Sequence, residues 1–237
     1  WGHNADVVAK KIDSLLYENV PGKILSKTEI AKSGYKGYDI TSRTRRGDYH
    51  RYNIFITPFE VIFFKTGGNG DYIKSGDEAK RFFGCIQLKE AKNGGWKKFQ
   101  PAYGSFAVDF PQQPNESFGD NVQYDAEDKA TNQHFSVIRT DIHNYRFAEE
   151  DTFDLALMDE SFGSGDFIES NLSRKQHVYR GYPALDARYR HKDGSILFTR
   201  FIIQGPHYYT LVAHGKDEAT STDKFFNSFE IIPFVYK

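Results

Sequence analysis

The chain has 237 residues, of which 39% are hydrophobic and 16% aromatic, enough for one large packed domain or two smaller ones. Its 31 basic and 32 acidic residues leave a formal net charge of −1, which argues against nucleic acid or an anionic membrane as the partner. No run approaches the roughly 18 apolar residues of a membrane-spanning helix. The one cysteine, Cys85, excludes an intrachain disulfide, and we expect it to be a small buried core residue.

The first third of the sequence predicts a helix, a group of strands and a second helix. Apolar residues at helical spacing predict the first helix over 5–18, with Asn4 as its N-cap. Period-two patterns and glycine or proline breaks predict strands at 23–30, 37–46, 51–57 and 59–66. A helix is expected at 75–83 and a short strand or helix exit at 86–88, and the segment from Lys89 to Tyr103 reads as a linker that packs through Trp96 and Phe99.

The remainder opens with a strand in which Phe106, Val108 and Phe110 alternate with smaller or polar residues, the pattern of a half-buried strand. Further strands are expected at 123–127 and 134–141, and an amphipathic helix at 153–162. Residues 167–178 begin a helix or a strand. After them we expect a meander of strands at 184–192, 196–204 and 207–214, a helix at 222–227 and a last strand at 229–235.

The chain repeats part of itself. Tyr35-Lys36-Gly37-Tyr38 returns as Tyr179-Arg180-Gly181-Tyr182, which we interpret as a turn in both copies. In each copy a basic strand, a glycine turn, two apolar strands and a Phe-Phe pair follow in the same order. Only the second copy has strands ahead of its first helix.

The fold class predicted from this repeat is α+β, with two related units, each a mainly antiparallel sheet with flanking helices. Residues 1–92 form a unit that is incomplete at its N-terminus, 93–103 form a linker, and 104–237 form the complete unit. An incomplete sheet exposes unpaired edge groups, which favours docking of another strand.

Several weak signals in the second unit share one layout. They are Phe106-x-Val108-x-Phe110-Pro111-x-x-Pro114, the strand Val137 to Asp141, the Gly181 turn, the meander with Arg200 and Tyr209, and the ending Phe225-Phe226-Asn227-Ser228-Phe229. This layout resembles the PsbP-like (Mog/PsbP) fold family, with the first unit as a partial repeat. The resemblance implies a central antiparallel sheet flanked by helices, and a binding role more than an enzymatic one, although a fold does not determine function.

Candidate partner-binding residues lie in the second unit. Tyrosine combines apolar area with a polar tip, and arginine offers a forked donor for acidic groups. Alternation along 186–191 places Asp186, Arg188 and Arg190 on one face of a strand. The candidates are Tyr179, Tyr182, Arg188, Arg190, Tyr208 and Tyr209. The alternative is that the tyrosines belong to the core and the arginines to a solvated, protected edge.

No pattern predicts a catalytic, cofactor-binding or metal site. His177, His191, His207 and His214 fall in one half of the chain but lack the close spacing of metal ligands, so only convergence from distant segments would join them. Gly67-Gly68-Asn69-Gly70 lacks the Lys-Ser/Thr of a phosphate-binding loop. No cofactor is therefore expected.

The leading hypothesis is a non-catalytic protein-binding or accessory protein of an exported or cell-envelope assembly. Export is expected because the chain begins at Trp1 and not at Met, as it would after removal of a leader. One alternative is a small-ligand binder or hydrolytic enzyme that uses a cleft between the two units. Another is a structural component, a homo- or hetero-oligomer, whose first unit is completed by another chain.

Overall fold

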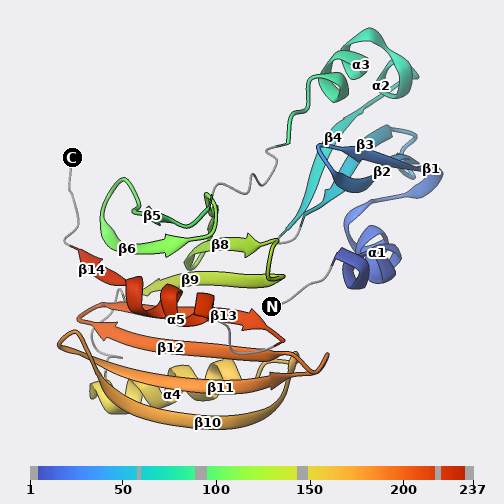
Figure 1. Ribbon diagram of the computed structural model, residues 1–237. Helices are drawn as coiled ribbons and strands as arrows, with labels where there is room; N and C mark the ends of the chain where they lie inside the picture. Colours follow the sequence, from blue (N-terminus) through green and yellow to red (C-terminus); the bar gives the residue numbers. More distant parts are fainter. Residues whose placement is uncertain (1–4, 58–59, 89–94, 143–148, 217–219, 233–237) are drawn as a thin grey trace. The chain divides into compact units, whose positions relative to one another are not determined.

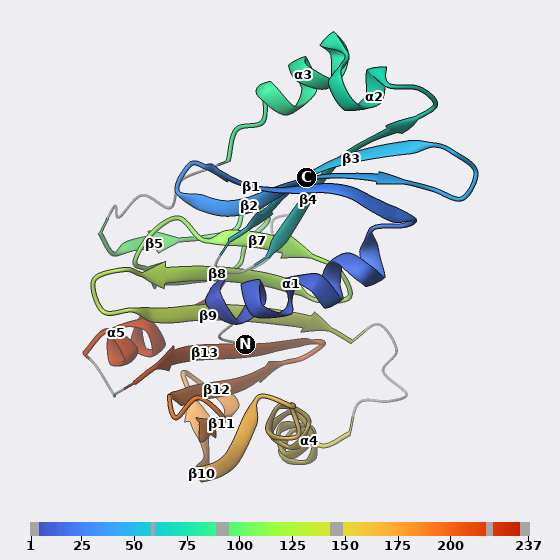
Figure 2. The same ribbon diagram turned by 90° about the vertical axis from the view of Figure 1, so that its right-hand side faces the viewer.

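The chain folds into two compact units, residues 3–90 and 91–237, in a computed structural model that describes residues 5–57, 60–88, 95–142, 149–216 and 220–232. Both units combine helices with antiparallel sheets, which confirms the predicted α+β class (Figures 1 and 2). Four expectations lie wholly or partly outside the described residues: the Asn4 cap, the start of the strand expected at 59–66, the part of the linker at 89–94 and the end of the last strand at 233–235.

The first unit is a helix followed by a four-stranded meander and two short helices. The elements are α1 (Ala5–Asn19), β1 (Lys23–Lys32), β2 (Tyr35–Arg43), β3 (Tyr49–Ile56), β4 (Val61–Gly68), α2 (Tyr72–Ser75) and α3 (Asp77–Gly84). The sheet order is β1-β2-β3-β4, and every pairing is antiparallel. The helix expected at 5–18, the four strands and the helix expected at 75–83, which is α3, are thereby confirmed, while α2 lies ahead of α3 and has no counterpart among the expected elements.

Helices cover both faces of this sheet, because successive residues of β3 point to opposite faces. Tyr52, Ile54 and Ile56 pack against the apolar side of α1. Phe55 points the other way and packs with Phe83 of α3, and α1 and α3 lie on opposite sides of the sheet (Figure 2). The central strand is therefore apolar on both faces, as in a three-layer arrangement.

The second unit contains two sheets. Its elements are β5 (Lys97–Phe99), β6 (Ser105–Phe110), β7 (Asn115–Phe118), β8 (Val122–Asp128), β9 (Gln133–Asp141), α4 (Asp151–Gly163), β10 (Ile168–Tyr179), β11 (Tyr182–His191), β12 (Ile196–Gln204), β13 (His207–Gly215), α5 (Thr220–Ser228) and β14 (Glu230–Ile232). The larger sheet has the order β10-β11-β12-β13-β9-β8-β7, and the smaller one β14-β6-β5. The sequence pattern of residues 167–178 is compatible with a helix or a strand, and the structure shows the strand β10.

The seven-stranded sheet is covered on both faces (Figure 1). On one face, α5 and β6 pack an aromatic core that includes Phe106, Phe225 and Tyr209. On the other face, Leu155 of α4 packs against β11 and β12, whose alternate residues, such as Tyr189, point that way. The alternation expected for residues 186–191 is confirmed, since Ala187, Tyr189 and His191 are buried while Arg188 and Arg190 are exposed.

Three local expectations are corrected by the structure, and one further strand appears. Residues 97–99 of the expected linker form β5 and pair with β6, so this segment belongs to the second unit's packing, and Trp96 contacts Phe135 as a packed residue would. Strand β7 was not predicted. No strand or helix forms at 86–88. Cys85 is exposed at the end of α3, because the helix buries the side that carries Ala79 and Phe83.

The Tyr-x-Gly-Tyr motif is a turn in one copy alone. In the second unit, Arg180 and Gly181 have positive φ and join β10 to β11. In the first unit the equivalent turn is Ser33-Gly34, three residues before the expected one, and Gly37 lies within β2. A Cβ on Gly37 would lie 2.0 Å from the carbonyl oxygen of Ile54, so close approach of the neighbouring strand explains this glycine.

Candidate functional site

Two of the candidate tyrosines are buried. Tyr209 is 0% exposed, and its hydroxyl lies 3.0 Å from Ser105 Oγ and 3.2 Å from the Ser105 carbonyl oxygen. Tyr208 points to the opposite face, where its hydroxyl donates a hydrogen bond to Asp154 of α4. The expected partner-binding role does not fit these side chains, because each is enclosed by its own unit and its polar tip is already bonded.

Tyr179 and Tyr182 flank the β10–β11 turn and are half-buried. The Tyr179 hydroxyl lies 2.8 Å from the carbonyl oxygen of Phe226, and the Arg200 guanidinium sits 4.4 Å from the centre of its ring. Arg200 also forms a bidentate ion pair with Asp186, in which Nε lies 2.7 Å from Oδ1 and Nη2 lies 2.8 Å from Oδ2. Tyr179 therefore helps to bind α5 to the sheet, and Tyr182 packs against the same core.

The first unit contains a similar group of carboxylate, arginine and aromatic ring. We call each such group an arginine clamp; that of the second unit is Asp186, Arg200 and Phe226. Arg51 of β3 pairs with Asp39 of β2 at 3.1 and 2.6 Å, and its guanidinium lies 4.8 Å from the ring centre of Phe83 in α3. In both units a carboxylate on the second strand of the meander holds an arginine of the third strand against a phenylalanine of the following helix. The register differs, since Asp186 faces Arg200 directly while Arg51 reaches Asp39 diagonally.

A surface of exposed cationic side chains lies on the α5 side of the seven-stranded sheet near its β10 edge. Arg188 and Arg190 are exposed on β11, and Lys175 of β10 stands opposite Asp186 on the same face. The Arg188 guanidinium lies 5.2 Å from the ring centre of Phe198, in cation–π range. We call Lys175, Arg188 and Arg190 the basic surface. Two of the predicted residues, Arg188 and Arg190, are thus placed together at the surface.

The sheet edges differ in how they are protected. β10 and β1 each begin with pairing irregularities, near Ile168–Ser173 and Ile24–Ser26, and carry lysine or arginine along an exposed strand. β7 is only four residues long. β4 pairs with β3 in continuous register from Val61 to Gly68 and includes the run Val61-Ile62-Phe63-Phe64. Bulges, charges and short length are the devices that keep an edge from pairing, and β4 has the fewest.

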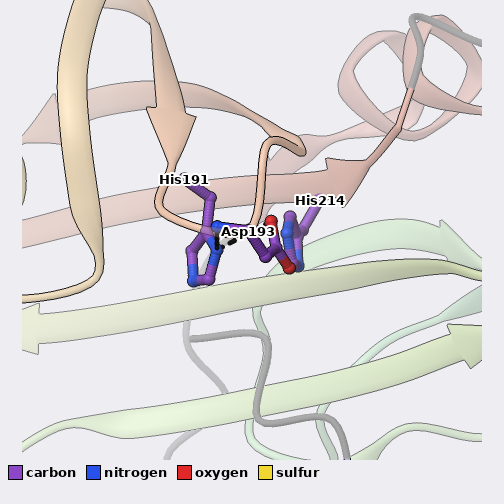
Figure 3. A group of neighbouring side chains, drawn as sticks. All are labelled: His191, Asp193 and His214. Atoms are coloured by element: carbon purple, nitrogen blue, oxygen red, sulfur yellow. Dashed lines mark hydrogen bonds and ion pairs between the residues drawn. The ribbon is translucent and has the colours of Figure 1, made fainter.

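A cluster of histidines and one carboxylate lies at the end of the seven-stranded sheet (Figure 3). His191 ends β11, Asp193 lies in the turn to β12, and His214 stands near the end of β13. The Nδ1 atom of His191 is 2.9 Å from Asp193 Oδ1, and the rings of His191 and His214 are 5.2 Å apart. One ligand atom from each of the three lies within 4.8 Å of the others.

Ser195 links the turn to His214. Its backbone N–H donates to Asp193 Oδ1 at 2.8 Å, its hydroxyl contacts the same oxygen, and its Oγ lies 2.5 Å from His214 Nε2. Burial opposes ionisation of Asp193, but the hydrogen bonds from Ser195 and His191 outweigh it and lower the pKa of Asp193 to about 2. Burial, with His191 and His134 nearby, lowers the pKa of His214 to about 4, so its imidazole is neutral at pH 7.

The sequence missed this cluster because its members are distant along the chain. The pattern His191-x-Asp193-x-Ser195 at a glycine turn was the one sequence signal for such a cluster. His214 lies 23 residues after His191, so no local spacing connects the two histidines. They meet because β12 returns the chain antiparallel and pairs Leu197 with His214. The other two histidines considered lie elsewhere: His177 pairs with Asp186 at 3.0 Å and His207 with Asp141 at 2.8 Å.

Within the described residues, no helix is long and apolar enough to span a membrane. No family model matches the chain, and no curated protein matches it.

Among solved structures the chain is similar to the cyanobacterial PsbP protein (CyanoP) from Synechocystis sp. PCC 6803, with a TM-score of 0.43 and 12% identity, over 63% of this chain and 99% of that one. A protein of unknown function from Pseudomonas aeruginosa, PA94, gives a TM-score of 0.32 and 11% identity, over 52% of this chain and 84% of that one. MucB, in its complex with MucA(peri), gives 0.23 and 9%, over 88% of this chain and 67% of that one. The chain therefore has structural similarity to a PsbP protein without a matching sequence family.

Proposed function

We propose that this chain is a non-catalytic binding protein that accepts an extended segment of another polypeptide at the β4 edge of its first unit. The observation that carries the proposal is the difference between two corresponding strands. In the second unit the fourth strand of the meander, β13, pairs with β9 on its far side. In the first unit the fourth strand, β4, has β3 as its one neighbour among the described residues.

The chemistry of β4 supports strand addition at this edge. A regular strand presents unpaired N–H and C=O groups along its outer side, and a partner strand satisfies them while its side chains extend the faces of the sheet. Phe63 of β4 is 36% exposed, and its neighbours Val61 and Phe64 already contact the two cores of the unit. The incoming segment would therefore be apolar on the positions that extend those cores.

The proposal includes a second contact, at the basic surface. Arg188 and Arg190 are exposed, and a guanidinium fork suits carboxylates better than an ammonium does. We infer that acidic side chains of a protein partner bind here. The proposal also places the protein outside the cytoplasm, and fractionation of cells that produce the natural protein checks this, since recovery with the cytoplasmic fraction would contradict it.

Site-specific photo-crosslinking tests the β4 edge. A benzoylphenylalanine at Phe63 is expected to form an adduct with one extended segment of a partner, because that position flanks the edge that would receive a strand. Ile24 on the β1 edge is the matched control, since it is 38% exposed in the same sheet. A synthetic peptide of the crosslinked segment should then slow hydrogen exchange of the β4 amides.

The variant Phe63→Lys supplies the second arm of the test. A lysine at the edge should abolish the amide protection by the peptide, whereas Ile24→Lys should leave unchanged both that protection and the adduct formed from position 63. Equal adducts from the two crosslinker positions, or a peptide that leaves β4 exchange unaltered, would contradict strand addition at β4.

A further inference from the structure

Three groups that suit a divalent metal ion converge at the β11–β12 turn. They are the imidazoles of His191 and His214 and the carboxylate of Asp193 (Figure 3). Two imidazoles and one carboxylate form a ligand set that Zn²⁺ uses in sites that keep a further coordination position for solvent. Asp193 is exposed while both histidines are buried, so the cluster opens to solvent on the side of the turn.

The hydrogen bonds around Ser195 determine which nitrogen of His214 is available. The Ser195 hydroxyl donates its one hydrogen to Asp193 Oδ1. Its oxygen can then only accept from His214 Nε2–H, so in the neutral ring Nδ1 of His214 is the nitrogen without a proton. That Nδ1 is buried and has no hydrogen-bond partner, and His214 as a whole is 7% exposed.

A buried, unprotonated imidazole nitrogen without a partner is unfavourable unless something occupies the space before it. A metal ion would satisfy it, and the Nε2–H···Oγ bond to Ser195 would orient the ring as outer hydrogen bonds do for metal-bound histidines. The Asp193 carboxylate can also bind an ion, since its three protein contacts all involve Oδ1.

The spacing requires only a small adjustment. Two atoms that each lie about 2.1 Å from one ion are at most about 4.2 Å apart. The present spread of up to 4.8 Å is slightly wider than that. Small rotations of these side chains would close the difference, and Asp193 lies in an exposed turn that contains Gly194.

From this geometry we propose that His191, Asp193 and His214 bind one Zn²⁺ ion, or a similar divalent transition metal, with Ser195 as the residue that positions His214. The proposal stands apart from strand binding at β4, since it uses residues of the second unit alone. A bound ion would join the β11–β12 turn to the end of β13.

Calorimetric titration with ZnCl₂ of the full chain, stripped of metal with a chelator, tests the site. The wild type is expected to bind one Zn²⁺ per chain at this site and to give visible absorption of four- or five-coordinate Co²⁺ when Co²⁺ replaces it. Asp193→Asn keeps an acceptor for the Ser195 N–H and is exposed, so it should fold normally. It should weaken binding by at least about tenfold, the loss that even outer-shell changes produce.

Further variants separate a metal site from general histidine binding. His214→Ala and His191→Gln should weaken Zn²⁺ binding at least as much as Asp193→Asn, and Ser195→Ala should weaken it by about 10–100-fold. His207→Ala, which removes a histidine paired with Asp141 away from the cluster, should leave binding unchanged. Folded wild-type protein that binds no Zn²⁺, or an Asp193→Asn variant that binds as tightly as wild type, would overturn the proposal.

Discussion

Replacing Tyr209 with alanine is expected to lower the free energy of unfolding of the second unit by about 3–5 kcal/mol, the usual cost of deleting a buried aromatic ring. Tyr209 is fully buried, and its ring lies 5.5 Å from that of Phe229 and 6.3 Å from that of Phe106. Its removal leaves a cavity between β13 and the smaller sheet. Urea unfolding followed by circular dichroism measures the loss.

The conservative variant Tyr209→Phe separates packing from hydrogen bonding. It keeps the ring and removes only the hydroxyl that bonds to Ser105, so a loss of about 1 kcal/mol is expected, with the Ser105 hydroxyl also losing a partner. Phe118→Ala, on an exposed side chain of the same unit, should change stability by no more than about 0.5 kcal/mol. A cost for Tyr209→Ala no larger than that for Phe118→Ala would contradict a packed core position for Tyr209.

Replacing Arg200 with alanine is expected to cost about 3 kcal/mol, the lower end of the range for removing one partner of a buried ion pair. The lower end applies because the Asp186 side chain is 40% exposed, although that of Arg200 is 13% exposed. The variant also loses contacts with the rings of Tyr179 and Phe226, which join the sheet to α5. Urea unfolding measures this loss as well.

Arg200→Lys is the matched control for this clamp. It retains the charge but cannot contact both carboxylate oxygens or stack as a planar group, so it should recover only part of the stability. Recovery to the wild-type value would show that charge alone matters and that the two-pronged geometry does not.

Acid should weaken the same clamp. Burial raises the pKa of Asp186, but hydrogen bonds from Arg200 and His177 outweigh it, so the folded-state pKa is lower than usual. This stabilisation is fully present above the unfolded pKa of about 3.9 and is lost as pH falls through the folded value. The stability difference between wild type and Asp186→Asn should therefore shrink below about pH 4. A difference that stayed constant to lower pH would contradict the assignment.

Local patterns in the sequence predicted the fold class and nearly every strand because alternation and helical spacing depend on neighbouring residues. The meander at 184–214 and the faces of residues 186–191 are examples. The same reasoning misplaced the first-copy turn by three residues. A glycine required by close strand approach, Gly37, has the same letter as a glycine required by positive φ, Gly34.

The sequence by itself determined a composition without a strong charge, a repeated helix–meander–helix order, and the pair of exposed arginines on β11. Only the tertiary structure decided which tyrosines are buried, because burial depends on what covers a strand: β6 and β14 for Tyr209, and α4 for Tyr208. It also decided that His191, Asp193 and His214 meet, since strand register across β12 brings them together. Contacts of this kind join residues that lie far apart in the chain, so no local pattern records them.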